Sequence, residues 1–149
     1  TRKESSAASD VYKRQLKATV HTNSRSIAAD DFFTGMFETA LEEDEIIESI
    51  SFSKPTKANY VKFPNPASRY AMVGVFVAQF GDEVRVAVTG AGESGVFRHQ
   101  EMESVLSSNF SADSLSSVNI DSDGLISDLH ASAEYRANLI KEMTKRAVV

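Results

Sequence analysis

The sequence predicts an α+β domain in which helices pack on one side of a small antiparallel sheet. An apolar run over residues 71–80 is followed by the turn Gly81-Asp82 and by an alternating strand over residues 83–89. This arrangement is typical of an antiparallel hairpin. Two segments with the apolar spacing of helices then close the chain. Strands that come first and helices that follow them indicate an α+β fold.

Composition limits the classes of function. The chain has 149 residues, a hydrophobic content of 42% and a net charge of −5. These values describe one domain, or one domain with part of another, that is not built to bind nucleic acid. It has no cysteine, and its three histidines lack metal-ligand spacing, so we expect no metal or iron–sulfur site within it. No run is long enough for membrane insertion and no signal peptide is present, which favours a cytoplasmic location.

The N-terminal part of the chain divides into two segments. Residues 1–16 lack apolar periodicity, so we expect a disordered leader that is foreign to the fold. Residues 17–43 contain a short strand, a turn and a returning strand, and then a helical apolar face. That face consists of Phe32, Phe33, Met36, Phe37 and Leu41. Because so many aromatic residues need a packing partner, we interpret residues 17–43 as the end of a preceding domain.

We assign residues 44–149 to the main domain, which opens with a strand over residues 45–52. Ile46, Ile50 and Phe52 occupy one face of this strand by alternation. Ile47 is a lone apolar residue on the other, polar face, as expected for a contact with a ligand or with another domain. A surface isoleucine without a function explains the pattern equally well.

A polar loop joins Lys62 to Tyr70 ahead of the apolar run. Pro64 and Pro66 restrict the backbone of this loop and hold Lys62 and Tyr70 at a defined separation. A rigid polar loop at the end of a buried strand is a common place to bind a ligand. The alternative is an ordinary connection in which Tyr70 caps the core.

The hairpin after this loop forms the centre of the predicted sheet. Its first strand, residues 71–80, is apolar on both faces and is therefore expected to be covered on both faces. In its second strand, the inward-facing residues are Val84, Val86 and Val88. The residues expected to face outward are Glu83, Arg85 and Thr89.

The helices are predicted over residues 100–107 and from the N-cap Ser132 to about Ala147. The buried stripe of the first helix consists of Met102, Val105 and Leu106. That of the second consists of Tyr135, Leu139, Ile140, Met143 and Ala147.

Two motifs imitate ligand sites. Gly90-Ala-Gly92-Glu-Ser-Gly95 matches the glycine pattern of dinucleotide-binding turns, but its strand is the second arm of a hairpin. We interpret it as a turn, with a weak nucleotide site at Gly90–Gly95 as the alternative. Asn119-x-Asp121-x-Asp123-Gly124 resembles the first half of a calcium loop. His130 stands where that loop needs a glutamate, which favours a simple turn.

Three blocks of sequence resemble a known family. They are Asp31-Phe-Phe-Thr-Gly-Met36 with Asp44-Glu-Ile-Ile47, then Lys62 through Ala71, then Tyr135-Arg136 with Lys145-Arg-Ala147. In this order and spacing, residues 18–149 resemble the C-terminal part of the FAD-binding (medium) subunit of molybdenum hydroxylases of the carbon monoxide dehydrogenase and xanthine dehydrogenase type. The resemblance implies a small antiparallel sheet with helices. It also implies a flavin held between this domain and a larger N-terminal FAD-binding domain, which we expect to be missing here.

The resemblance also implies a cofactor, partners and site residues. Lys62 matches a lysine that approaches the flavin of FAD, Tyr70 matches the aromatic residue beside its ring, and Ile47 falls at an apolar cofactor contact. No residue is assigned a catalytic role. The full subunit would take electrons from a molybdopterin-containing large subunit through the iron–sulfur clusters of a small subunit. The present chain alone is expected to be inactive and to bind FAD weakly or not at all. The competing interpretation is a free-standing α+β interaction module without flavin.

Overall fold

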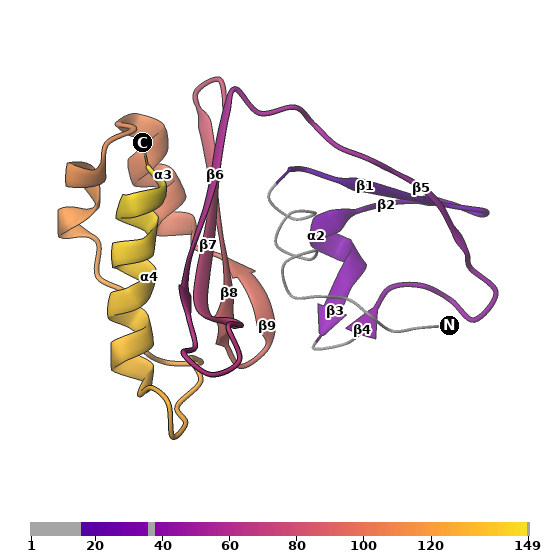
Figure 1. Cartoon of the computed structure of the whole chain (residues 1–149). Coiled ribbons are helices and arrows are strands. Elements are labelled where there is room, and N and C mark those ends of the chain that lie inside the picture. The colour runs from indigo at the N-terminus through magenta and orange to yellow at the C-terminus, as the bar shows by residue number, and fades with distance from the viewer. Residues whose placement is uncertain (1–15, 36–37, 149) are drawn as a thin grey trace.

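The computed structural model describes residues 16–35 and 38–148. Two units lie side by side in Figure 1, a small N-terminal unit and a larger C-terminal one. Residues 1–15 of the expected leader, and Met36 and Phe37 of the expected helical face, lie outside the described residues. The described strands form three separate antiparallel sheets.

The C-terminal unit is built on a four-stranded antiparallel sheet with the order β6-β7-β8-β9. Its strands are β6 (Lys57–Pro64), β7 (Ala71–Phe80), β8 (Glu83–Gly92) and β9 (Gly95–Arg98). The predicted central hairpin is confirmed, and Gly81 in its turn has a φ of +63°. The edge strands β6 and β9 were not predicted, because β6 mixes polar and apolar residues along its exposed edge and β9 is short.

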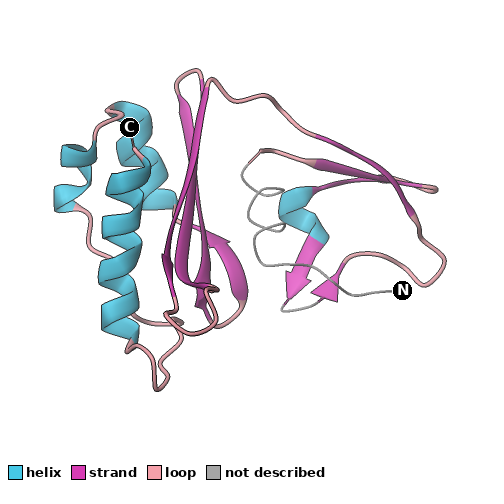
Figure 2. Ribbon diagram, in the orientation of Figure 1, coloured by secondary structure: helices cyan, strands magenta, loops and turns pink. Residues whose placement is uncertain are grey.

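Helices cover one face of this sheet, as Figure 2 shows, which confirms the predicted α+β class. They are α3 (Gln100–Ser108), the 3₁₀ helix η1 (Ala112–Ser117) and α4 (Ala133–Ala147). The hydroxyl of Ser132 caps α4 by accepting a hydrogen bond from the backbone N–H of Tyr135 at 3.3 Å, so the predicted start of this helix is confirmed. Valines of β7 and β8 pack under Met102 and Ile140. None of the described helices combines the length and the apolar character that crossing a membrane requires.

The second face of the sheet is also covered, on the side where the N-terminal unit lies (Figure 1). Here the expectation that Arg85 and Thr89 face outward is wrong, because both side chains are buried. A guanidinium nitrogen of Arg85 donates to Asp30 of the N-terminal unit at 2.7 Å, and Arg98 donates to the same carboxylate oxygen at 3.3 Å. Alternation separates the two faces of a strand, but it does not reveal what packs on each of them.

The N-terminal unit contains a three-stranded sheet with the order β2-β1-β5. Its strands are β1 (Thr19–Thr22), β2 (Ser26–Ala28) and β5 (Ile47–Ser51). The predicted strand, turn and return are therefore confirmed. The strand β5, which the sequence placed in the main domain, pairs with β1, and Ile50 lies opposite Val20. The chain thus changes from one sheet to the other between β5 and β6.

The predicted helical face after residue 30 is wrong over most of its length. The helix α2 (Ala29–Phe32) has a single turn, and β3 (Phe33–Gly35) and β4 (Glu38–Thr39) follow it as a short antiparallel ribbon. The chain leaves the helical conformation at Phe33, two residues before Gly35. Phe32 is buried against Val20 and Ile27 of the β2-β1-β5 sheet. The apolar residues at helical spacing therefore belong to a core formed on a sheet and not to one face of a long helix.

Both motifs that imitate ligand sites are turns. The glycine motif spans the end of β8 and the start of β9, with Gly92 paired to Gly95, so β9 separates it from α3. A glycine loop that binds a pyrophosphate should lead into a helix, which contradicts a nucleotide site at Gly90–Gly95. In the second motif, Asp121 accepts a hydrogen bond from the backbone N–H of Asp123 at 3.0 Å. No group of three metal-ligating side chains occurs in the described part of the chain.

Gly90 should be intolerant of any side chain. Its φ is +77°, and a Cβ atom there would lie 2.4 Å from the carbonyl oxygen of Ala71, which belongs to the backbone and cannot move away. We expect Gly90→Ala to lower the free energy of unfolding by about 2–4 kcal/mol, measured by urea denaturation. Gly124→Ala is the matched control, because Gly124 has a φ of +73° but open space around it. It should cost only about 1 kcal/mol, and equal costs for the two variants would contradict the steric argument.

Candidate functional site

Two of the three predicted site residues, Lys62 and Tyr70, lie on either side of the connection between β6 and β7. Lys62 lies within β6 opposite Gly74, and Tyr70 immediately precedes β7. The ammonium group of Lys62 donates a hydrogen bond to the carbonyl oxygen of Arg69 at 3.1 Å. The structure therefore brings Lys62 and the backbone next to Tyr70 together, although Lys62 is a strand residue and not part of the loop.

The connection is held by Asn65 as well as by its prolines. The backbone N–H of Asn65 donates to the carbonyl of Tyr70 at 2.8 Å, and its side-chain oxygen accepts from the backbone N–H groups of Ala67 and Ser68 at 2.9 and 3.2 Å. Arg69 adopts a φ of +63°, a conformation that a tight local turn imposes. The Tyr70 side chain is 78% exposed, so it does not cap the core. The turn instead presents an aromatic ring to the surroundings.

Positive charge gathers at this connection. The side chains of Lys62 and Arg69 are exposed, and neither forms an ion pair within residues 16–35 and 38–148. This contrasts with the net charge of −5 of the whole chain. An exposed aromatic ring beside cations that lack carboxylate partners suits a planar ligand with a polar edge on which negative charge develops.

Arg136 supports the connection from inside the protein. It is 4% exposed, and one guanidinium nitrogen donates to the carbonyl oxygens of Met72 and Gly90 at 2.7 and 3.0 Å. Another nitrogen donates to the Asp128 carboxylate at 2.8 Å. The pKa of Asp128 is lowered by the backbone N–H of His130, by that of Ala131 and by Arg136. The helix α4 is thereby tied to the strand ends beneath the connection.

The apolar periodicity of the helix did not predict the role of Arg136. This residue was named only within Tyr135-Arg136, one of the sequence blocks that carry the family resemblance. A usable signal was present, because Arg136 stands three and four residues before Leu139 and Ile140 and therefore lies on the buried stripe of the helix, where the sequence had placed the exposed Tyr135. A charged residue in such a place requires buried partners. Its neighbour Tyr135 contacts Phe63 of β6 edge to face, with ring centres 6.4 Å apart.

The third predicted residue, Ile47, belongs to β5 of the N-terminal unit and shares no sheet with Lys62 or Tyr70. Its side chain is 38% exposed, and the neighbouring Ile46 and Phe52 are exposed as well. The structure thus presents an apolar surface at this strand but does not join it to the β6–β7 connection.

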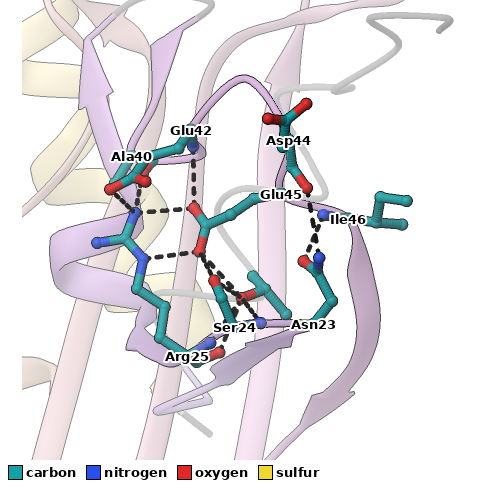
Figure 3. Close-up of polar contacts among 9 residues, drawn as sticks. Asn23, Ser24, Arg25, Ala40, Glu42, Asp44, Glu45 and Ile46 are labelled. Atoms are coloured by element: carbon teal, nitrogen blue, oxygen red, sulfur yellow. Dashed lines mark hydrogen bonds and ion pairs between the residues drawn. The ribbon is translucent and has the colours of Figure 1, made fainter.

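A hydrogen-bond network around Glu45 positions the start of β5 (Figure 3). The Glu45 side chain is 4% exposed and accepts two hydrogen bonds from the guanidinium group of Arg25, at 2.7 and 2.8 Å. The three other donors are the hydroxyls of Thr22 and Ser24 and the backbone N–H of Glu42. Arg25 is the largest cause of the lowered pKa of Glu45. The carboxylate therefore joins the β1–β2 turn to the residues that lead into Ile47.

Comparison with known proteins adds what the geometry alone does not supply. No protein-family model matches the chain. The chain is 35% identical over 135 residues to the nicotine 6-hydroxylase medium subunit of Paenarthrobacter nicotinovorans, a match that covers 84% of the chain. It is 27% identical over 138 residues to the carbon monoxide dehydrogenase medium chain of Hydrogenophaga pseudoflava, across 83% of the chain. The chain is therefore similar to medium subunits of the molybdenum hydroxylase type.

The chain spans about half the length of these relatives, since each match covers 47% of the relative. Solved structures show the same fold. Quinoline 2-oxidoreductase from Pseudomonas putida 86 superposes with a TM-score of 0.73 at 23% identity. Carbon monoxide dehydrogenase from Hydrogenophaga pseudoflava gives 0.65 at 22% identity. Both comparisons cover 94% of this chain and 54% of the other.

The Glu45 network should make the N-terminal unit sensitive to acid. Because the pKa of Glu45 in the folded chain lies below its ordinary value of 4.5, its stabilising contribution is complete above about pH 4.5 and is lost as the pH falls further. We expect Glu45→Gln to be less stable than the parent at pH 7 but to lose less stability between pH 4.5 and pH 3, measured by thermal unfolding. Glu43→Gln, which removes an exposed carboxylate of the same segment, is the control. A parent and a Glu45→Gln variant with the same acid dependence would contradict this role.

Proposed function

We propose that this chain is the C-terminal part of a medium subunit that binds FAD and helps to enclose its flavin ring. The observation that carries the proposal is the 35% identity to the nicotine 6-hydroxylase medium subunit across 84% of the chain. The exposed aromatic and cationic groups of the β6–β7 connection support it. Bound FAD would supply redox chemistry that links a one-electron donor to a two-electron reaction.

The side chains at the connection fit a flavin ring, which has apolar faces and a polar pyrimidine edge. Tyr70 offers an exposed ring that can lie against such a face. Lys62 offers a cation without a carboxylate partner in the described chain, and a cation stabilises the negative charge that develops on the pyrimidine edge during reduction. Ile47 would contribute an apolar contact from β5. We assign these three residues to cofactor binding and none to proton transfer.

We further propose that the N-terminal unit, including β5, is the end of a preceding FAD-binding domain. The separate β2-β1-β5 sheet supports this assignment, as does the 47% coverage of the relatives. The partners would be a molybdopterin-containing large subunit and a small subunit that holds the iron–sulfur clusters. The absence of cysteine agrees with clusters carried by another chain. In such a complex this chain is part of an oxidoreductase, and alone it would be inactive.

The cofactor itself provides the first test. The complete polypeptide encoded by the reading frame that contains this chain should be purified and its visible spectrum recorded. We expect flavin absorption bands, and release of FAD on denaturation identified by chromatography. Residues 16–149 alone should bind added FAD with a Kd weaker than about 10 μM, because the Gly90–Gly95 hairpin offers no phosphate-binding turn. A complete polypeptide that neither contains FAD nor binds it would refute the proposed function.

Lys62 should raise the reduction potential of the bound flavin. Two opposite unit charges about 4 Å apart attract each other with an energy of roughly 4 kcal/mol at an effective dielectric constant near 20. Exposure of Lys62 to solvent reduces this energy. We expect Lys62→Met to lower the midpoint potential by about 30 mV, equivalent to about 1.4 kcal/mol in a two-electron couple, measured by redox titration of the complete polypeptide. Tyr70→Ala should leave the potential closer to that of the parent and should increase reoxidation by oxygen. If Lys62→Met still binds flavin and its midpoint potential is unchanged, Lys62 has no electrostatic role and serves only to hydrogen-bond the carbonyl of Arg69.

A further inference from the structure

Two arginine side chains of the four-stranded sheet converge on one carboxylate of the N-terminal unit. Nη2 of Arg85 lies 2.7 Å from Oδ2 of Asp30, and Nη1 of Arg98 lies 3.3 Å from the same oxygen. Arg98 of β9 is paired with Ala87 of β8, and Arg85 stands two residues before Ala87, so both arginines lie on the second face of the sheet. The side chain of Arg85 is 5% exposed, whereas that of Asp30 is 46% exposed. Asp30 therefore supplies the negative charge that a buried arginine requires.

Each end of this bridge is fixed to the core of its own unit. Asp30 belongs to α2, and Phe32 of the same helical turn is buried in the core of the N-terminal unit. On the other side, Glu103 of α3 accepts hydrogen bonds from the Arg98 guanidinium group at 2.9 and 2.7 Å. Glu103 also accepts a hydrogen bond from the backbone N–H of Val86 at 2.9 Å. A continuous series of charged groups thus links the core of one unit to the helices of the other.

The other contacts between the two units are of a different kind. Residues 52–56 connect β5 to β6 outside any strand. Leu16 packs against the second face of the sheet, and Lys17 forms an ion pair with Glu83 in which both side chains are partly exposed. Of these contacts within the described chain, the bridge at Asp30 alone involves a buried charge, that of Arg85. Because a buried charge is screened little by solvent, displacement of its partner is more costly than at the surface.

We infer that Asp30 is a positioning residue for the flavin site, because it holds the unit that carries Ile47 against the sheet that carries the β6–β7 connection. This inference rests on the proposed function, in which both units contribute to one cofactor site. Asp30 itself would not touch the cofactor, since Arg85 and Arg98 bind it towards the Gly81 end of the sheet and the connection lies at the other end. Without its carboxylate, the two units would adopt several relative placements. Only the placement that brings Ile47 and the connection to the same ring would bind flavin.

The relative placement of the two units can be measured directly, because the chain contains no cysteine. Spin labels attached to Glu48→Cys in β5 and Asn138→Cys in α4, two exposed positions, report the distance between the units by pulsed electron spin resonance. We expect a narrow distribution of distances in the parent chain and a broader one in Asp30→Asn. Asp30→Glu keeps the carboxylate and should restore the narrow distribution. Asp31→Asn is the matched control, because it removes an exposed carboxylate from the same helical turn and should match the parent.

The cofactor provides the second readout, in the complete polypeptide. Asp30→Asn should raise the Kd for FAD about tenfold, measured by titration of flavin fluorescence, if the binding arrangement falls to about one tenth of the population. Asp30→Glu and Asp31→Asn should bind FAD like the parent. A merely structural role of Asp30 would lower the unfolding temperature of Asp30→Asn but leave the distances and the Kd of the folded protein unchanged.

The possible outcomes separate this inference from the proposed function. If the parent binds FAD and Asp30→Asn changes neither the distances nor the Kd, or changes only one of them, the inference is overturned and the proposed function stands. A parent that binds no FAD overturns both. If Asp30→Asn does not fold because Arg85 is left buried without a carboxylate, Asp30→Asn combined with Arg85→Met replaces it in both measurements. This double variant removes both charges and fills the place of the arginine with an apolar side chain.

Discussion

The hydrogen bonds of the Arg136 guanidinium group hold together the end of the molecule that carries the candidate site. The ladder between β7 and β8 begins with the pair Gly74 and Thr89, so the carbonyl groups of Met72 and Gly90 lie beyond it. Arg136 of α4 donates a hydrogen bond to each of these two carbonyls, so its side chain links β7 to β8 where their backbone pairing has ended. A buried cation is costly unless its partners are well placed, and Asp128 provides the balancing charge. The helix, both central strands and the connection above them are therefore positioned by one side chain.

The second face of the sheet combines structural and candidate functional roles along its length. Near the Gly81 turn it is used to join the two units, because Asp30 accepts hydrogen bonds from both Arg85 and Arg98. Arg98 is fixed in turn by Glu103 of α3. At the opposite end, Lys62 is exposed and its ammonium group donates to the carbonyl of Arg69 within the same unit. The ion pairs of Asp30 with Arg85 and Arg98 therefore join the two units at the end of the sheet away from Lys62.

The parts of the fold that could be predicted from the sequence are those with a local signal. The hairpin through Gly81 and the helix capped by Ser132 each depend on residues close together in the chain. The pairing of β5 with β1 depends on a choice between distant partners, and the edge strand β6 lacks a regular apolar pattern. The site divides in the same way. The nearness of Lys62 to the backbone beside Tyr70 follows from a short connection, whereas the role of Arg136 depends on carbonyl groups of two strands that are distant from it in the sequence.

The edge position of β6 has a consequence for the behaviour of the chain in solution. An unpaired strand edge can template pairing with a second molecule and so begin aggregation. Lys57 and Lys62 place charges along this edge, and Pro64 at its end lacks a backbone donor. Such residues act as gatekeepers, because two copies brought edge to edge would place like charges side by side. The lysine proposed to meet the cofactor therefore also protects the sheet from growing by one more strand.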